Sequence, residues 1–185
     1  DTQLIWGGFA VKLEAIHQYK PHLDNGQNHV TAATGGLEYT FVGIAGSSVD
    51  YTAAVEYLYD SRGVLDPNSA QAVAQRRLLR GDTFTADEAR ALEFIKPQTF
   101  SAVQNDVFVG GRIALNNESD TDFRGGVIVD LENKDTIISI EGNHRISNDW
   151  KLSGLVRVVN VKEDGNPAFF LRQDDYIQLE LTRFF

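Results

Sequence analysis

The chain has 185 residues, of which 42% are hydrophobic and 23% charged, and its formal net charge is −9. Aromatic and β-branched residues are too frequent for a disordered chain, and the absence of cysteine excludes disulfides and Cys-ligated metal sites. No run of about 18 apolar residues is present, which excludes a helical membrane protein. The acidic balance, without a basic patch, predicts no nucleic-acid partner.

Two features concern domain organisation and processing. The length predicts a single domain over residues 1–185. The sequence contains no methionine, and its first six residues lack the basic start of a signal peptide. We therefore expect a mature, trimmed or partial chain.

Period-two alternation of apolar and polar residues is the main signal along the chain. It predicts strands that are mostly longer than the usual 5–6 residues of soluble sheets and close to the ~9–11 that a tilted strand needs to cross a bilayer. The predicted strands are 4–17, 33–44, 49–60, 106–115, 122–131, 136–145, 150–161 and 176–185.

The connections between these strands alternate in length. Long connections are predicted at 18–32, 61–105 and 162–175, and short ones at 45–48, 116–121 and 146–149, while the short connection 132–135 breaks the alternation. Long and short connections at opposite rims are typical of an up-and-down outer-membrane barrel, whose short turns face the periplasm. The pattern then places both chain ends on the short-turn side.

The insert at about 61–105, between the third and fourth predicted strands, carries helix signals. Residues 68–79 are rich in Ala and Arg and end before Gly81, and Thr85 with Glu88 forms a capping box that opens a second helix. The insert is interpreted either as an inward-folded plug or as a surface excursion. Its arginines are candidates to contact lipopolysaccharide phosphates or acidic solutes, or to form a solvated helix face: Arg76, Arg77, Arg80 and Arg90.

The alternation assigns the charged residues of the strands to one face and the apolar residues to the other. Charges of both signs stand at mid-strand on the polar face, and aromatic residues gather toward strand ends, as in an aromatic girdle. A membrane barrel would turn the polar face toward its lumen. The lumen-lining candidates are Lys12, Glu14, Glu38, Asp50, Glu56, Arg112, Arg124, Asp130, Glu141, Arg145, Lys151, Arg157 and Glu180.

The C-terminal stretch carries a family resemblance. Residues 175–185, Asp-Tyr-Ile-Gln-Leu-Glu-Leu-Thr-Arg-Phe-Phe, resemble the last strand of Gram-negative outer-membrane β-barrel proteins, which ends in Phe after alternating apolar residues. Arg183 departs from the aromatic residue often found two positions before that end. The resemblance implies an outer-membrane location, contact with outer-membrane lipid and lipopolysaccharide, and recognition by the barrel-assembly machinery through Ile177, Leu179, Leu181 and Phe185. Stretches 13–16, 56–63 and 105–110 also look similar to the C-terminal part of larger outer-membrane proteins, which implies further strands or subunits that complete a larger barrel.

The interior permits two outcomes. An eight-stranded barrel has room only for its own side chains, so its charges must pair and the protein is a closed structural anchor. In a larger barrel the same residues line a wet, porin-like pore.

Other chemistries have weaker signals. His144 and Ser147 are the nearest approach to a Ser–His pair of an outer-membrane lipid hydrolase, but Ser147 falls in a turn. His17, His22 and His29 flank the first long connection without diagnostic metal-ligand spacing. We expect no enzyme activity, no metal and no cofactor.

The sequence thus predicts an all-β fold: a transmembrane, antiparallel, up-and-down β-barrel with eight strands in this chain and a helix-containing loop after the third. The predicted function is a passive channel or a membrane anchor in the outer membrane of a Gram-negative bacterium. The alternative is a soluble, lipocalin-like barrel with the apolar face inside, binding an apolar ligand.

Overall fold

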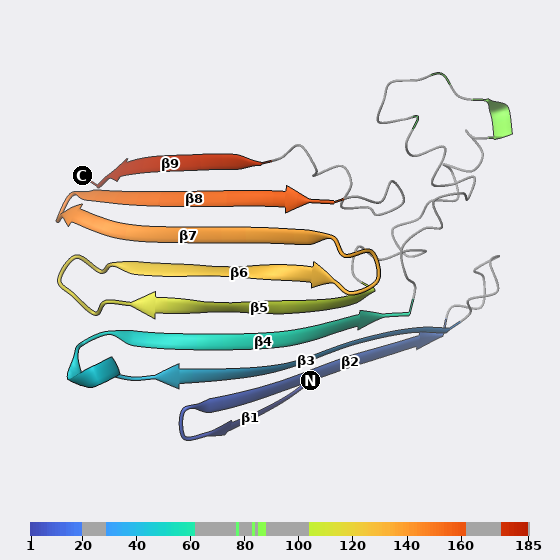
Figure 1. Ribbon diagram of the computed structural model, residues 1–185, viewed down its shortest axis with the longest axis horizontal. Coiled ribbons are helices and arrows are strands. Elements are labelled where there is room, and N and C mark those ends of the chain that lie inside the picture. Colours follow the sequence, from blue (N-terminus) through green and yellow to red (C-terminus); the bar gives the residue numbers. More distant parts are fainter. Residues whose placement is uncertain are drawn as a thin grey trace.

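The computed structural model describes residues 1–19, 29–61, 77, 83, 85–87, 104–161 and 175–184. These residues form one nine-stranded sheet in which each strand pairs antiparallel with its neighbours in chain order (Figure 1). This confirms the predicted all-β, antiparallel, up-and-down arrangement. The strands are β1 Thr2–Trp6, β2 Phe9–Tyr19, β3 His29–Phe41, β4 Asp50–Asp60, β5 Asn105–Ala114, β6 Asp122–Asp130, β7 Thr136–Ser147, β8 Trp150–Asn160 and β9 Tyr176–Arg183, with a 3₁₀ turn η1 at Ile44–Gly46.

The count of eight strands is wrong, because the predicted strand 4–17 is a hairpin. Gly7 has a φ of 58°, in the left-handed region that glycine adopts at low cost, and the chain reverses at Gly7–Gly8. Trp6 then pairs with Phe9, and Thr2 with Leu13. The predicted position of the N-terminus is wrong for the same reason, since β1 runs toward the short-turn rim and Asp1 starts away from it.

The connections fall at two rims, which we name by their lengths. The short-turn rim holds the connections β1–β2, β3–β4, β5–β6 and β7–β8 and the end of β9, on the left in Figure 1. The long-connection rim joins β2 to β3, β4 to β5 and β8 to β9, as well as the short β6–β7 turn. The helices predicted in the 61–105 insert lie outside the described residues, apart from Arg77 and 85–87.

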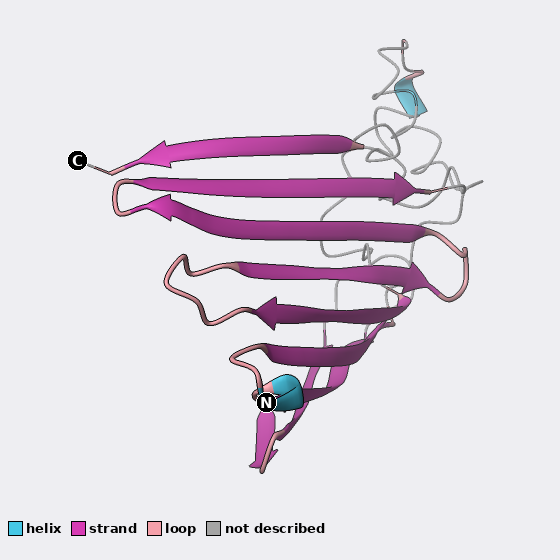
Figure 2. Cartoon of the chain, turned by 60° about the vertical axis from the view of Figure 1, so that its left-hand side comes forward, coloured by secondary structure: helices cyan, strands magenta, loops and turns pink. Residues whose placement is uncertain are grey.

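The sheet is curved and open. Figure 2 shows β6–β9 broadside while β1–β3 turn edge-on, so the sheet curls toward its first strands. β1 and β9 are the two ends of the strand order and do not pair with each other. Closure into the predicted barrel is therefore not part of this structure.

Close contacts between aromatic rings and glycines support the curved sheet. The ring of Phe108 lies over Gly110 and Gly126, so that a Cβ on Gly126 would stand 2.7 Å from the ring Cζ. On the other face, Phe123 covers Gly142, where a Cβ would meet the ring at 2.8 Å. Glycine inside a strand is destabilising by itself, and here it makes room for a ring from the neighbouring strand.

The described residues contain almost no hydrophobic core. The only buried apolar side chains among them are Val30, Val159 and Val161, and no described side chain is fully buried. The apolar face stays uncovered, with Val109 49% exposed and Leu179 75% exposed. Sheet hydrogen bonds and contacts between neighbouring side chains are therefore what hold these residues together.

We predict that Gly126→Val displaces the Phe108 ring and lowers the free energy of unfolding by about 1–3 kcal/mol, the usual cost of overpacking. Chemical unfolding followed by circular dichroism measures this loss. Phe108→Ala in the same chain should recover the part of the loss that the ring causes, while the close approach to the Val109 carbonyl, at 2.9 Å, remains. Gly35→Val is the matched control, since a Cβ there has only Leu13 nearby, at 3.7 Å. Equal losses at Gly35 and Gly126 would contradict the ring contact.

Candidate functional site: the polar face

All thirteen predicted lumen residues lie on one face of the sheet. Residues directly opposite each other on paired strands point the same way, and successive residues of a strand alternate. The register joins Thr52, Arg112, Arg124 and Glu141 in one row across β4–β7, and Glu38 to Arg157 in the next row through Ala54, Gly110, Gly126 and Ser139. We call this surface the polar face.

A hollow of about 530 Å³ lies on the polar face. Residues from β3 to β8 line it, which means that the sheet curves around this side. Five of the predicted residues contribute to the lining: Glu38, Arg112, Arg124, Glu141 and Arg157. Three others also line the hollow and are not among the lumen-lining candidates, although the alternation assigns them to the same face: Thr52, Phe108 and Ser139.

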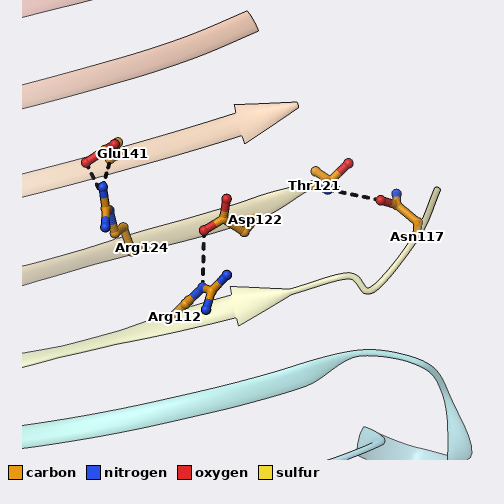
Figure 3. A network of polar contacts seen from close by, with 6 residues as sticks. All are labelled: Arg112, Asn117, Thr121, Asp122, Arg124 and Glu141. Atoms are coloured by element: carbon orange, nitrogen blue, oxygen red, sulfur yellow. Dashed lines mark hydrogen bonds and ion pairs between the residues drawn. The ribbon is translucent and has the colours of Figure 1, made fainter. Parts of the chain in front are cut away.

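Two ion pairs cross the strands beside the hollow (Figure 3). Arg124 donates from Nε to Oε2 of Glu141 at 3.0 Å and from Nη2 to Oε1 at 2.8 Å, and Arg112 Nε donates to Asp122 Oδ2 at 3.2 Å. Arg112 and Arg124 are direct neighbours in the register. Like charges in that position repel, so each guanidinium is held by a carboxylate of its own.

The polar face of β2–β4 is arranged differently. Lys12 Nζ and Glu38 Oε2 are 3.2 Å apart, and the Thr34 hydroxyl donates to Glu56 at 2.6 Å. Lys12, Glu14 and Glu56 also line a second, smaller hollow of about 330 Å³. This part of the face carries mainly carboxylates.

Three cationic residues of β7 and β8 have no carboxylate within 4 Å among the described residues: Arg145, Lys151 and Arg157. Arg145 and Lys151 are direct neighbours in the register near the short-turn rim. On β9, Glu180 accepts from the Thr182 hydroxyl at 3.1 Å.

Asp130 ends β6 at the long-connection rim, and its side chain stabilises the β6–β7 turn. Its Oδ1 accepts from the backbone amides of Glu132 at 2.8 Å and Asn133 at 2.9 Å, the pattern of an Asx turn. It pairs in the register with Asp106, and both side chains are buried. Asp130 therefore stabilises the turn at this rim and does not line the hollow.

The predicted assembly residues lie on the apolar face of the edge strand β9. Ile177, Leu179 and Leu181 alternate there and are all exposed, while Phe185 lies outside the described residues. Phe184 is described, and its backbone amide donates to the Asp149 carbonyl at 2.8 Å, which fastens the end of the chain to the β7–β8 turn.

The other candidate residues are held by local partners. His144 Nδ1 and the Thr121 hydroxyl are 2.8 Å apart, and Ser147 Oγ accepts from the Asp149 amide at 3.4 Å, so the structure does not join His144 to Ser147. His17 and His29 meet on the apolar face, with Nε2 and Nδ1 3.3 Å apart, while His22 lies outside the described residues. No group of three or more metal-ligating side chains occurs in the described part of the chain.

Comparison with protein families, with curated proteins and with solved structures finds no match to this chain. In the part of the chain that the structure describes, no helix is both long and apolar enough to cross a membrane. The case for a function consequently depends on the geometry of the two faces.

We predict a small, salt-sensitive coupling between Arg124 and Glu141. Their side chains are 60% and 33% exposed, so a double-mutant cycle with Arg124→Gln and Glu141→Gln should give about 0.3–1 kcal/mol. The coupling should approach zero in about 1 M salt, where the Debye length is about 3 Å. Unfolding midpoints at low and high salt measure it. The uncharged Asn143–Ser153 pair, 2.9 Å apart, is the control whose coupling should not change with salt.

Proposed function

We propose that this chain forms the wall of a Gram-negative outer-membrane β-barrel that acts as a porin-like passive channel. The apolar face lies against lipid and the polar face lines the lumen. The observation that carries the proposal is the pairing of an uncovered apolar face with a hollowed, charged face on a single curved sheet.

The apolar face has the form of a belt. One register row runs from Leu4 to Val158 with an apolar residue at every position: Leu4, Val11, Leu37, Val55, Val109, Val127, Ile138 and Val158. On β4 the apolar positions run from Tyr51 to Tyr59, roughly 27 Å along the strand at about 3.4 Å per residue. An outer-membrane barrel presents an apolar band about 25 Å tall, so the belt has the height that a bilayer requires.

Aromatic rings border the belt at the short-turn rim. Phe9 and Tyr39 have ring centroids 4.2 Å apart, Tyr39 and Phe41 4.4 Å, and Phe41 and Tyr51 6.1 Å. Tyr57 and Tyr59 stand on the same face toward the other rim. Two aromatic borders around an apolar band are typical of the interfaces of a membrane barrel.

Closure of the barrel involves further strands or subunits in this proposal. Eight successive antiparallel pairings leave β1 and β9 running in the same direction. An antiparallel closure requires an odd number of additional strands between them. A barrel of at least ten strands exceeds the eight-stranded size at which side chains fill the interior, which favours a wet pore over a filled anchor.

The two rims give the orientation. Outer-membrane barrels have short periplasmic turns and longer extracellular loops. The short-turn rim, with the end of β9, is therefore assigned to the periplasm. The long-connection rim, where β4 ends and β5 begins, is assigned to the lipopolysaccharide side.

The alternative functions receive less support. A lipocalin-like barrel would curve around its apolar face, whereas the hollow lies on the polar face. The lipid hydrolase suggested by the sequence would pair His144 with Ser147, whereas the described partner of His144 is Thr121 and Ser147 accepts from the Asp149 amide. Extraction that requires detergent distinguishes the membrane proposal from the soluble alternative.

We predict that Val109→Arg, at the middle of the apolar belt, destabilises the membrane-inserted protein by about 2–4 kcal/mol, the cost of Arg at the bilayer midplane. Refolding into lipid vesicles under a denaturant series measures this cost. Ala54→Arg is the matched control on the polar face, beside Glu38, and should insert nearly as well as the unchanged chain. A monodisperse, detergent-free protein that tolerates Val109→Arg would overturn the proposal.

A planar-bilayer recording tests the channel itself. We expect inserted protein to give a steady open current, because the polar face is solvated and carries charges of both signs. Protein that is inserted, as shown by protection from external protease, and yet electrically silent would replace the channel with a structural anchor.

A further inference from the structure

Arg157 stands apart from the other arginines of the hollow. Arg112 and Arg124 each bind a carboxylate of a neighbouring strand, whereas Arg157 has none within 4 Å among the described residues. Its Nε atom is buried and has no hydrogen-bond partner there. Among the described residues, its guanidinium lies over the ring of Tyr176, with the guanidinium carbon 5.6 Å from the ring centroid.

The nearby acids are already engaged. Glu141, which lies diagonally across from Arg157 in the β7–β8 register, uses both carboxylate oxygens on Arg124. Glu38, in the same row as Arg157, is bound to Lys12. A buried hydrogen-bonding group without a partner is costly, and an unpaired charge costs more. Arg157 is thus a cation in the wall of a hollow, ready for an anionic partner from outside the sheet.

The surroundings of Arg157 define the rest of that partner. Ser139 lies directly opposite on β7 and offers a hydroxyl. The next register row presents an apolar strip to the same hollow, made of Phe108, Ile128 and Ile137. Gly110 and Gly126 bear no side chains, and the Phe108 ring lies across them as a flat apolar floor. A charged group and an apolar body therefore have separate places in one hollow.

The geometry points to a binding site for small organic monocarboxylates on the polar face: the carboxylate on Arg157 and Ser139, and an aromatic or aliphatic body over Phe108, Ile128 and Ile137. The guanidinium fork suits a planar carboxylate. Glu38 and Glu141 line the same hollow and disfavour anions with several charges. This inference deepens the proposed channel by naming the solute class that its wall retains, and it rests on that proposal.

The test is calorimetric titration of benzoate into the refolded, detergent-solubilised protein, with acetate as a ligand of the same charge but without the apolar body. We expect benzoate to bind more tightly than acetate. Arg157→Ala should weaken benzoate binding by at least about tenfold, the effect of losing a charged hydrogen bond. Phe108→Ala should reduce the preference for benzoate over acetate. Arg145→Ala is the matched control, because Arg145 also has no carboxylate within 4 Å among the described residues of the polar face but does not line the hollow.

A second measurement uses the unchanged chain and so does not depend on whether Arg157→Ala folds. Phenylglyoxal modifies arginines, and peptide mass analysis reports each site. Benzoate should protect Arg157 and leave Arg145 unprotected. Equal protection of both, or of neither, overturns the inference, as does unaltered benzoate affinity in folded Arg157→Ala. A protein that inserts into vesicles and conducts but does not bind benzoate disproves only this site, whereas a monodisperse, detergent-free protein that tolerates Val109→Arg disproves the proposed function.

Discussion

The strict alternation of side chains along β2–β9 is the constraint on which the rest of the structure depends. Each strand places most of its apolar residues on one side and its charged residues on the other, and the register aligns the apolar residues into continuous rows across one face of the sheet. In a soluble protein that face would be covered by a second layer. The described residues provide no such layer, and the strands satisfy their backbone groups through pairing alone. An apolar solvent that needs no hydrogen bonds is the environment this arrangement suits.

The same alternation fixes the register of the strands, and the register in turn places like charges next to each other on the polar face. A slip of one residue would send every apolar side chain to the lumen, so the register must be held firmly. Phe108 over Gly126 and Phe123 over Gly142 fit in one register only. The register then brings Arg112 beside Arg124, and Asp122 and Glu141 offset that repulsion. The ring–glycine contacts and the ion pairs thus stabilise the same register of the strands.

The two faces of the sheet can be predicted from the sequence, whereas most of the contacts between side chains cannot, for physical reasons. Parity along a strand is a local property, so the thirteen charged residues were assigned to one face without knowledge of their neighbours. The hairpin at Gly7–Gly8 was missed because Leu4, Ile5 and Trp6 are consecutive apolar residues, which hide the change of parity. Phe108 is an apolar residue on the polar face, and its role depends on glycines of its own strand and the next. Arg157 likewise has no carboxylate partner among the described residues because Glu141 binds Arg124 instead, and a strand pattern does not show which of the two arginines Glu141 binds.

The distribution of charge along the sheet gives the proposed lumen a direction. On β2–β4 the only cation of the polar face is Lys12, against Glu14, Glu38, Asp50 and Glu56. On β5–β8 several carboxylates are occupied, since Asp122 and Glu141 bind arginines and Asp130 caps a turn. Those strands therefore present three cations that have no carboxylate within 4 Å in the part of the chain that the structure describes: Arg145, Lys151 and Arg157. Because the sheet curls, Glu38 and Arg157 line the same hollow, so an acidic wall and a basic wall face a shared space. In the proposed channel, a solute with one carboxylate and an apolar body would be attracted to the basic wall and repelled from the acidic one, and this would orient the solute as it passes. A neutral solute of the same size would cross that space without such a preference.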